Sequence, residues 1–177
     1  MIAIEDMSLE ELAGYICNYL DNHGINCVLS GGACVSIYSN NEYQSADLDF
    51  IDIGNTQRKK IKEILSELGF EEFNRYFKHI DVKYFIEFPS GPLSIASERV
   101  QVISELSLST GILKLLSPTD CIKDRLAAYY FWDDKQSLAQ AILVAKAQKI
   151  NIEEIERWSA VENCSDKFNE IRNKLIF

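Results

Sequence analysis

The sequence predicts an α+β protein in which a mixed β-sheet flanked by helices is followed by a helical C-terminal part. Up to residue 116, short apolar runs alternate with segments of helical periodicity, whereas the pattern after Pro118 is helical throughout. The 177 residues, of which 47% are hydrophobic and 25% charged, suffice for a hydrophobic core. We therefore expect an α/β core at residues 1–116 and a helical subdomain at 117–177 packed on that core.

The first elements are a helix, a strand and a second helix. Ser8 and Glu11 form a capping-box pattern in front of apolar residues at helical spacing. An apolar strand follows at residues 25–29, then a turn at residues 30–32, and a helix that begins at residues 33–38.

Strands and one helix are expected in the next forty residues. Apolar residues mark a strand at 48–51, and Thr56 is expected to cap a helix that Gly69 ends. Aromatic and β-branched residues then predict strands at 73–77 and 83–88, with the polar residues between them as a turn.

The remaining chain is expected to contain the end of the sheet and several helices. Apolar residues between 100 and 115 predict one strand, or two short ones, near the sheet edge. Ser117 and Pro118 indicate the start of a helix that runs to about Trp132. Further helical patterns lie around residues 138–145, from residue 151 onward, and at 167–175.

The charge balance limits the kinds of partner. Lys and Arg total 18 against 27 Asp and Glu, a net charge of -9, so the surface as a whole repels polyanions. Nucleic-acid binding would need a local basic patch. The basic run at residues 58–62 lies in a helical pattern with acidic neighbours, and we interpret it as a solvated helix face.

Cysteine usage and hydropathy indicate the compartment. The five widely spaced cysteines favour reduced core thiols over disulfides, and with two histidines a zinc site is not expected. No segment has the roughly 18 consecutive apolar residues of a membrane span, and the N-terminus lacks a signal-peptide pattern. We expect a cytoplasmic location and no membrane partner.

Asp47 and Asp49 are the first candidates for chemistry. Alternate side chains of a strand share a face, so both carboxylates project together, with backbones roughly 7 Å apart. A divalent cation relieves the repulsion between them, and oxygen ligands of this type suit Mg²⁺ or Mn²⁺. Taken alone, the pattern fits two solvated aspartates on an edge strand at least as well.

Ser30, Gly31 and Gly32 strengthen the prediction of a site. Glycines between an apolar strand and a helix let the backbone approach an anion, with free N–H groups of the helix directed at phosphate. Ser30 can add a hydroxyl donor. A plain tight turn is the alternative, but the order of strand, Ser-Gly-Gly, helix and Asp-Leu-Asp strand is more specific.

With these motifs, the sequence resembles the DNA polymerase beta-like nucleotidyltransferase superfamily. Its members have a Gly-Gly or Gly-Ser turn followed by a strand in which two aspartates alternate with apolar residues. The segment Ser-Ala-Asp-Leu-Asp-Phe at residues 45–50 is most similar to the branch of abortive-infection toxin nucleotidyltransferases. The resemblance covers roughly residues 24–88 and implies a nucleotidyltransferase-like sheet.

The resemblance also implies a third carboxylate on a neighbouring strand, for which Asp81 and Glu87 are the candidates. They lie roughly 20 Å apart along an extended strand, so both cannot bind the same metals. We favour Glu87, because an ionised group among Phe85 and Ile86 needs a partner, whereas Asp81 lies in a polar turn. A glutamate here departs from the aspartate that is more usual in the superfamily.

The activity implied by the resemblance is metal-dependent transfer of a nucleoside monophosphate from an NTP to an unidentified acceptor. The cofactor would be Mg²⁺ or Mn²⁺, and the acceptor a tRNA, a protein or a small molecule such as an aminoglycoside. Lys123 and Arg125 fit ordinary salt bridges slightly better than they fit phosphate binding. The expected catalytic residues and metal ligands are Asp47, Asp49 and Glu87, and the expected nucleotide-binding residues are Ser30, Gly31, Gly32, Ser45, Lys123, Arg125 and Lys135.

Two other functions fit the same pattern. The protein could be a catalytically weak nucleotide-binding protein, or a toxin–antitoxin-type interaction protein that binds a protein partner through its C-terminal helices. The aromatic run at residues 129–132 favours a hydrophobic seam that joins the C-terminal helices to the sheet over a base-stacking surface. His79 is expected to be a solvated turn residue.

Overall fold

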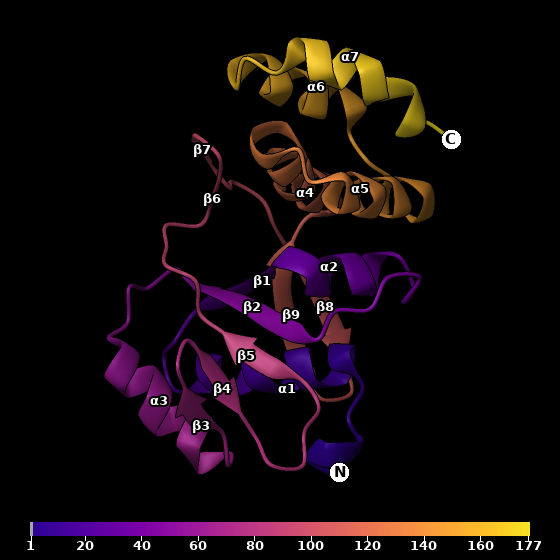
Figure 1. Cartoon of the computed structure of the whole chain (residues 1–177). Coiled ribbons are helices and arrows are strands. Elements are labelled where there is room, and N and C mark those ends of the chain that lie inside the picture. Colours follow the sequence, from indigo (N-terminus) through magenta and orange to yellow (C-terminus); the bar gives the residue numbers. More distant parts are fainter. Residues whose placement is uncertain (1) are drawn as a thin grey trace.

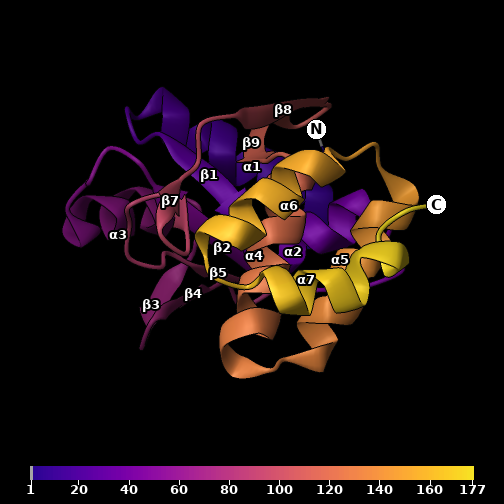
Figure 2. The same cartoon turned by 90° about the horizontal axis from the view of Figure 1, so that it is seen from above.

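The structure, a computed structural model, describes residues 2–177 and has a seven-stranded mixed sheet with helices on both faces (Figures 1 and 2). The α+β class and the flanked mixed sheet are therefore confirmed. The sheet strands are β1 (Cys27–Ser30), β2 (Asp47–Asp52), β3 (Glu71–Phe73), β4 (Tyr76–Lys78), β5 (Phe85–Glu87), β8 (Ile103–Leu108) and β9 (Gly111–Leu116). Their order across the sheet is β3-β4-β5-β2-β1-β9-β8.

The remaining elements are helices and one small hairpin. The hairpin consists of β6 (Ser94–Ile95) and β7 (Glu98–Arg99). The helices are η1 (Ile4–Asp6), α1 (Leu9–Asn22), α2 (Gly31–Tyr38), α3 (Arg58–Glu67), α4 (Pro118–Trp132), α5 (Lys135–Ala147), α6 (Ile152–Val161), α7 (Ser165–Ile171) and η2 (Arg172–Lys174). Figure 1 shows α1 and α3 below the sheet, with α2 and helices α4 to α7 above it.

Side-chain alternation in β2 separates the core from the site. Leu48 and Phe50 are fully buried on the side of the sheet core, whereas Asp47 and Asp49 are half-buried on the opposite face. The N-terminal helix starts as predicted, because Ser8 and Glu11 form a complete capping box.

Helix α4 joins the sheet to the other C-terminal helices. Its N-cap is Ser117, whose hydroxyl accepts a hydrogen bond from the Asp120 N–H at 3.1 Å, as the Ser-Pro pattern predicts. Tyr130 stacks on the buried Trp158 of α6 with ring centroids 5.7 Å apart. Tyr129 and Tyr130 are buried, as expected for a hydrophobic seam, but the stacking partner of Tyr130 lies in α6 and not in the sheet. Trp132 is 77% exposed.

The β6–β7 hairpin reaches from the sheet part to α6. Glu98 accepts two hydrogen bonds from the Arg157 guanidinium, at 2.8 and 2.6 Å. The Ser97 N–H donates to Glu162 at 3.0 Å. Residues that precede position 117 therefore pack against the helical part, and a subdomain boundary at 116/117 stays a prediction.

Three predicted boundaries are wrong. Residues 73–77 are not one strand: Phe73 ends β3, residues 74–75 form the hairpin turn, and Tyr76 begins β4, because Asn74 takes a left-handed conformation with φ of 56°. Thr56 does not cap α3; its N–H binds the Asp52 carboxylate instead, and the helix begins after Gln57. Helix α2 begins at Gly31, two residues before the expected start.

The apolar residues between 100 and 115 form the two strands of the β8–β9 hairpin. Only β8 lies at the sheet edge, because β9 pairs with β1 in parallel. The basic helix face pairs within the helix as predicted only at Lys59 and Glu63. Arg58 and Lys62 pair instead with Glu72 of β3. All five cysteines are free thiols. Within residues 2–177, no helix combines the length and apolarity needed to cross a bilayer.

Candidate active site

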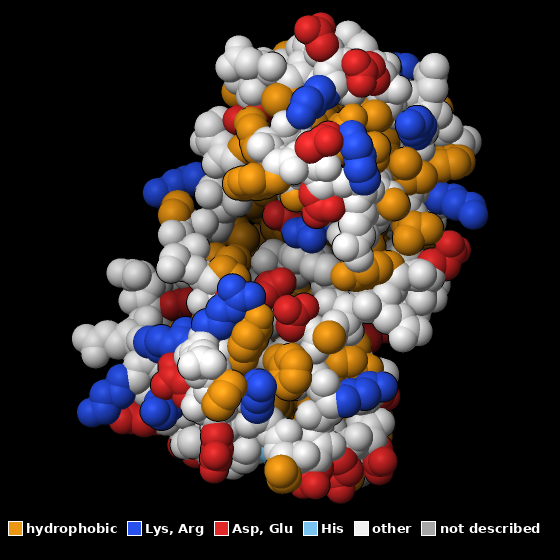
Figure 3. All heavy atoms as spheres, viewed as in Figure 1, with side chains coloured by type: hydrophobic (Ala, Val, Ile, Leu, Met, Phe, Trp, Pro, Cys, Tyr) orange, Lys and Arg blue, Asp and Glu red, His pale blue; other side chains and the backbone are white. Residues whose placement is uncertain are grey.

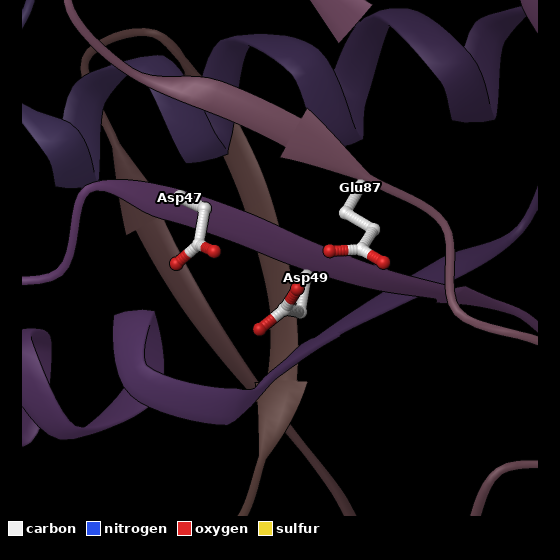
Figure 4. A group of neighbouring side chains, drawn as sticks. All are labelled: Asp47, Asp49 and Glu87. Atoms are coloured by element: carbon white, nitrogen blue, oxygen red, sulfur yellow. The ribbon is translucent and has the colours of Figure 1, made fainter. Parts of the chain in front are cut away.

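Pairing between β2 and β5 brings three carboxylates together. The two strands are parallel, and the register places Asp49 beside Glu87. One carboxylate oxygen from each of Asp47, Asp49 and Glu87 lies within 4.8 Å of the others, and Figure 4 shows all three side chains on one face. We call these residues the carboxylate triad.

The triad has a strong excess of negative charge. Burial, followed by the charges of Asp47 and Glu87, raises the pKa of Asp49 to about 7. The positive charge of Arg125 lowers that pKa only in part. Closely spaced carboxylate oxygens with uncompensated charge are a suitable donor set for Mg²⁺ or Mn²⁺, so the residues present fit a divalent cation.

The Ser-Gly-Gly turn packs directly against the triad. Gly31 has a φ of +66°, and a Cβ atom at this position would lie 2.3 Å from the Asp49 carboxylate oxygen Oδ2. Only glycine therefore allows this approach. The Ser30 hydroxyl donates to the backbone carbonyl of Asp49 at 3.2 Å, which ties the turn to β2.

Ser45 holds Asp47 in place. Its hydroxyl donates to the Asp47 carboxylate oxygen Oδ1 at 2.9 Å. It also packs under the turn, because a Cβ atom at Gly32 would lie 3.1 Å from the Ser45 Oγ. Ser45 is buried, and its distance to the carboxylate makes it a residue that orients Asp47.

The three predicted cations lie in different surroundings. Arg125 is half-buried, donates from Nε to Asp124 at 3.0 Å, and acts electrostatically on Asp49. Lys123 is only 6% exposed, and its Nζ lies 2.6 Å from Glu154 Oε1 in α6 and 3.2 Å from Asp120 Oδ1. Its ammonium group is thus neutralised by two carboxylates.

Lys135, the third cation, lies at the start of α5. Its Nζ is 2.6 Å from the Asp133 carboxylate and 4.9 Å from the centre of the Tyr129 ring. Asp133 belongs to the α4–α5 connection and Tyr129 to α4, and neither is part of the triad. Of the three predicted nucleotide-binding cations, only Arg125 therefore acts on the triad.

Arg75 is a charged neighbour of the triad that sequence reasoning did not single out. Its Nε lies 3.4 Å from Glu87 Oε1, at the tip of the β3–β4 hairpin. The turn residue Asn74 beside it was a usable signal, since Asn tolerates the left-handed conformation. Asp81 is exposed outside the triad, and His79 is half-buried against Phe70 rather than solvated.

Comparison with known proteins places this geometry in a known fold. No protein-family model and no curated protein sequence matches the chain. Among solved structures, an antigenic nucleotidyltransferase-like protein from Paracoccidioides brasiliensis aligns with a TM-score of 0.65 and 15% identity, over 94% of this chain and 91% of that one. The chain has a nucleotidyltransferase-like fold.

The antibiotic-resistance factor ANT(2'')-Ia has the same fold. Its solution structure aligns with a TM-score of 0.55 at 13% identity, over 93% of this chain and 96% of that one. Its crystal structure in complex with adenylyl-2''-tobramycin gives a TM-score of 0.55 at 13% identity, over 83% and 92%. These likenesses support the fold expected from the superfamily resemblance, whereas the abortive-infection branch stays a prediction.

In this nucleotidyltransferase-like fold, the site lies along a row of residues that pair with one another across neighbouring strands. Tyr76 of β4 pairs with Glu87, Glu87 pairs with Asp49, and Asp49 pairs with Ser30. The row therefore crosses four adjacent strands, with the Ser-Gly-Gly turn at one end and Tyr76 at the other. Figure 3 shows that this side of the molecule is hollowed between the sheet part and the helices above it.

Proposed function

We propose that this protein is a metal-dependent nucleotidyltransferase that moves a nucleoside monophosphate from an NTP to an acceptor hydroxyl. The observation that carries the proposal is the carboxylate triad, with oxygens within 4.8 Å, against the Gly31 turn of a nucleotidyltransferase-like fold. The structure of ANT(2'')-Ia with an adenylylated aminoglycoside supports the reaction class by analogy of fold.

The triad residues would hold Mg²⁺ or Mn²⁺. When bound, such a cation neutralises the charge on the transferred phosphoryl group and on the leaving pyrophosphate. Ser45 orients Asp47 for this task through its 2.9 Å hydrogen bond. The first N–H groups of α2 would bind the triphosphate, and the Ser30 hydroxyl holds the Ser-Gly-Gly turn on β2.

Arg125 adds positive charge behind Asp49, since it already lowers the pKa of that carboxyl. Lys123 is left out of the proposed site because its carboxylate partners hold it towards α6. Lys135 would reach the nucleotide only after leaving Asp133, so we assign it no role in the transfer.

The reaction exchanges one phosphorus–oxygen bond for another. The acceptor oxygen forms a bond to the α-phosphorus, and the bond from that phosphorus to the bridging oxygen of pyrophosphate breaks. The proton of the acceptor hydroxyl is released to solvent. The attacking oxygen of the acceptor and the leaving oxygen of pyrophosphate lie on opposite sides of the phosphorus. The acceptor and the pyrophosphate therefore need separate binding sites on the sheet.

Label transfer tests the proposal. The purified protein is incubated with each α-³²P-labelled NTP, Mg²⁺ or Mn²⁺, and cell extract. We expect a labelled acceptor with the wild-type protein and at least a roughly hundredfold loss in Asp49→Ala, because the triad is broken. Asp81→Ala is the matched control and should transfer label normally, since Asp81 lies outside the triad.

Equal transfer by the wild type and Asp49→Ala, or no transfer with any NTP, would contradict the proposal. Within the superfamily we place the chain closest to the abortive-infection branch, on the strength of residues 45–50. The free thiols of all five cysteines fit the reducing cytoplasm that we infer as its location.

A further inference from the structure

Three outer strands present an uncovered face next to the triad. Side chains alternate, so Phe77 and Ile86 are buried on the side of the sheet that α3 covers, and the neighbouring residues point the other way. We call this second set the aromatic–basic face. It consists of Phe73, Tyr76, Lys78 and Phe85, together with Arg75 of the intervening turn. Glu71 pairs with Lys78 and lies at the outer edge of the same face.

Cations and aromatic rings alternate on this face. The Lys78 Nζ lies 4.5 Å from the centre of the Phe73 ring and 4.6 Å from that of Phe85. The Arg75 guanidinium lies 4.8 Å over the Tyr76 ring. Figure 3 shows hydrophobic and basic side chains interleaved on the lower part of the molecule, below the hollow.

The face is available to a ligand. Phe73 is 57% exposed, so its ring is accessible to a ligand. Within residues 2–177, Lys78 forms no ion pair with a carboxylate, and the only such pair of Arg75 is with Glu87. Both cations can therefore turn towards an incoming anion.

The row of paired residues across the sheet indicates from which side the acceptor reaches the triad. Under the proposed function, the triphosphate lies at the Ser30 end of the row, and the triad residues Asp49 and Glu87 occupy its centre. In-line transfer requires the acceptor to approach from the side opposite the leaving pyrophosphate. Tyr76, which pairs with Glu87, lies on that side of the triad. The acceptor would therefore approach over the aromatic–basic face, to which Tyr76 belongs.

We propose that the aromatic–basic face binds the acceptor, and that the acceptor is a nucleotide unit. Its base stacks on the exposed rings, and its phosphate is held by Arg75 and Lys78. This inference rests on the proposed function, because it names the substrate class of the same site. The nucleotide unit is either free or the unpaired end of an RNA strand.

The charge of the whole molecule limits how much of a polymer can bind. A net charge of -9 repels long polyanions, so contact is confined to the few nucleotides that the face covers. Aminoglycosides carry protonated amino groups, which would meet the like charges of Arg75 and Lys78. The face therefore suits a phosphate-bearing acceptor better than a polycationic one.

Binding without catalysis tests the inference. Fluorescence anisotropy follows fluorescein-labelled penta-adenylate on the full-length protein, without NTP or metal. We expect saturable binding that weakens on raising salt from about 50 to 200 mM. We also expect it to weaken about tenfold or more in both Phe73→Ala and Lys78→Ala, since stacking and phosphate contacts are lost.

Matched controls come from exposed residues elsewhere. Phe131→Ala removes a half-exposed aromatic side chain of α4, and Lys59→Ala removes an exposed cation of α3; both should bind like the wild type. Competition by free AMP at concentrations similar to those of the oligonucleotide assigns the site to a free nucleotide. Failure of AMP to compete assigns it to an RNA end.

The inference is overturned if the wild type binds neither probe, if binding is insensitive to salt, or if the Phe73 and Lys78 variants bind normally. Stabilisation by Mn²⁺ with NTP separates this failure from failure of the proposed function. A protein that is stabilised by Mn²⁺ and NTP but binds no oligonucleotide keeps its proposed activity and loses the acceptor assignment. A protein that binds the oligonucleotide but is not stabilised by Mn²⁺ and NTP loses the proposed function, and with it the acceptor role of the face, which then remains a nucleotide-binding surface.

Discussion

Gly31 and Asp49 show how one missing side chain shapes the site. The Asp49 carboxylate occupies the space that a Cβ atom at position 31 would need, 2.3 Å from Oδ2. The backbone of Gly31 also has a φ of +66°, where other residues are strained. Space and backbone conformation therefore impose two separate requirements for glycine at this position.

Gly31→Ala should lower both stability and ligand binding. Gly24→Ala is the matched control, because Gly24 has a similar φ of +74° but nothing within 4 Å of its added Cβ atom. We expect Gly24→Ala to cost about 1–2 kcal/mol of unfolding free energy from strain alone. Gly31→Ala should cost more and should abolish stabilisation by Mn²⁺ with NTP. Equal effects of the two variants in urea unfolding would contradict the clash.

The pKa of Asp49 predicts an unusual dependence of stability on pH. The folded carboxyl keeps its proton up to about pH 7, whereas the ordinary pKa of an aspartate is 3.8, so folding takes up a proton between these pH values. The contribution of Asp49 to stability is complete below pH 3.8 and is lost as the pH rises through about 7. The slope approaches about 1.4 kcal/mol per pH unit.

Metal-free protein is used for the measurement, with unfolding by urea across the pH range. Asp49→Asn lacks the titrating group, so its free energy of unfolding should lack this decline with pH. All other ionisable groups are common to both proteins, and the difference between the two curves isolates Asp49. Parallel curves would show that the pKa of Asp49 is not raised.

At the scale of elements, buried charges connect α4 to α6. Lys123 lies in α4 between Asp120 of the same helix and Glu154 of α6, and Arg157 links Glu154 to the β6–β7 hairpin. The network bridges two helices and the hairpin. Its partners explain why a lysine on the predicted nucleotide-binding helix is buried.

Lys123→Met should destabilise the fold by about 3 kcal/mol, because it leaves two carboxylates without their buried cation. Lys135→Met should change the unfolding free energy by less than about 0.5 kcal/mol, since Lys135 is exposed. Chemical denaturation of both variants measures the difference. If Lys123→Met has wild-type stability but no longer binds NTP, the network is not what Lys123 serves, and its predicted role in nucleotide binding would be supported.

At the scale of the whole molecule, the site depends on both parts of the fold. The triad comes from β2 and β5, whereas Arg125 comes from α4 above the sheet. Ligands that contact both parts stabilise the folded state as a unit.

Mn²⁺ with NTP should therefore raise the melting temperature. At about 100 times the Kd, the stabilisation is about 2.7 kcal/mol, which corresponds to roughly 5–10 °C for a chain of this size. Differential scanning fluorimetry measures the shift, and EDTA should reverse it. Asp81→Asn should keep the shift and Asp49→Asn should lose it; a wild type without any shift would exclude the proposed metal and nucleotide site.

Local features of the chain were the most predictable from sequence. The Ser8 capping box, the helix start at Ser117 and the shared face of Asp47 and Asp49 follow from residues within a few positions of one another. The hairpin turn at Asn74 was missed because the aromatic residues on either side of it were interpreted as one strand at residues 73–77. Arg75 was missed with it.

By itself, the sequence determined the fold class, the order of most elements, and the pairing of an Asp-Leu-Asp strand with a Ser-Gly-Gly turn. These follow from periodicity and turn chemistry, which report local backbone geometry. Only the tertiary structure decided that Glu87 lies beside Asp49, that Lys123 faces α6, and that Tyr76 continues the row. Such neighbours are selected by strand register and packing between distant segments, which no local pattern encodes.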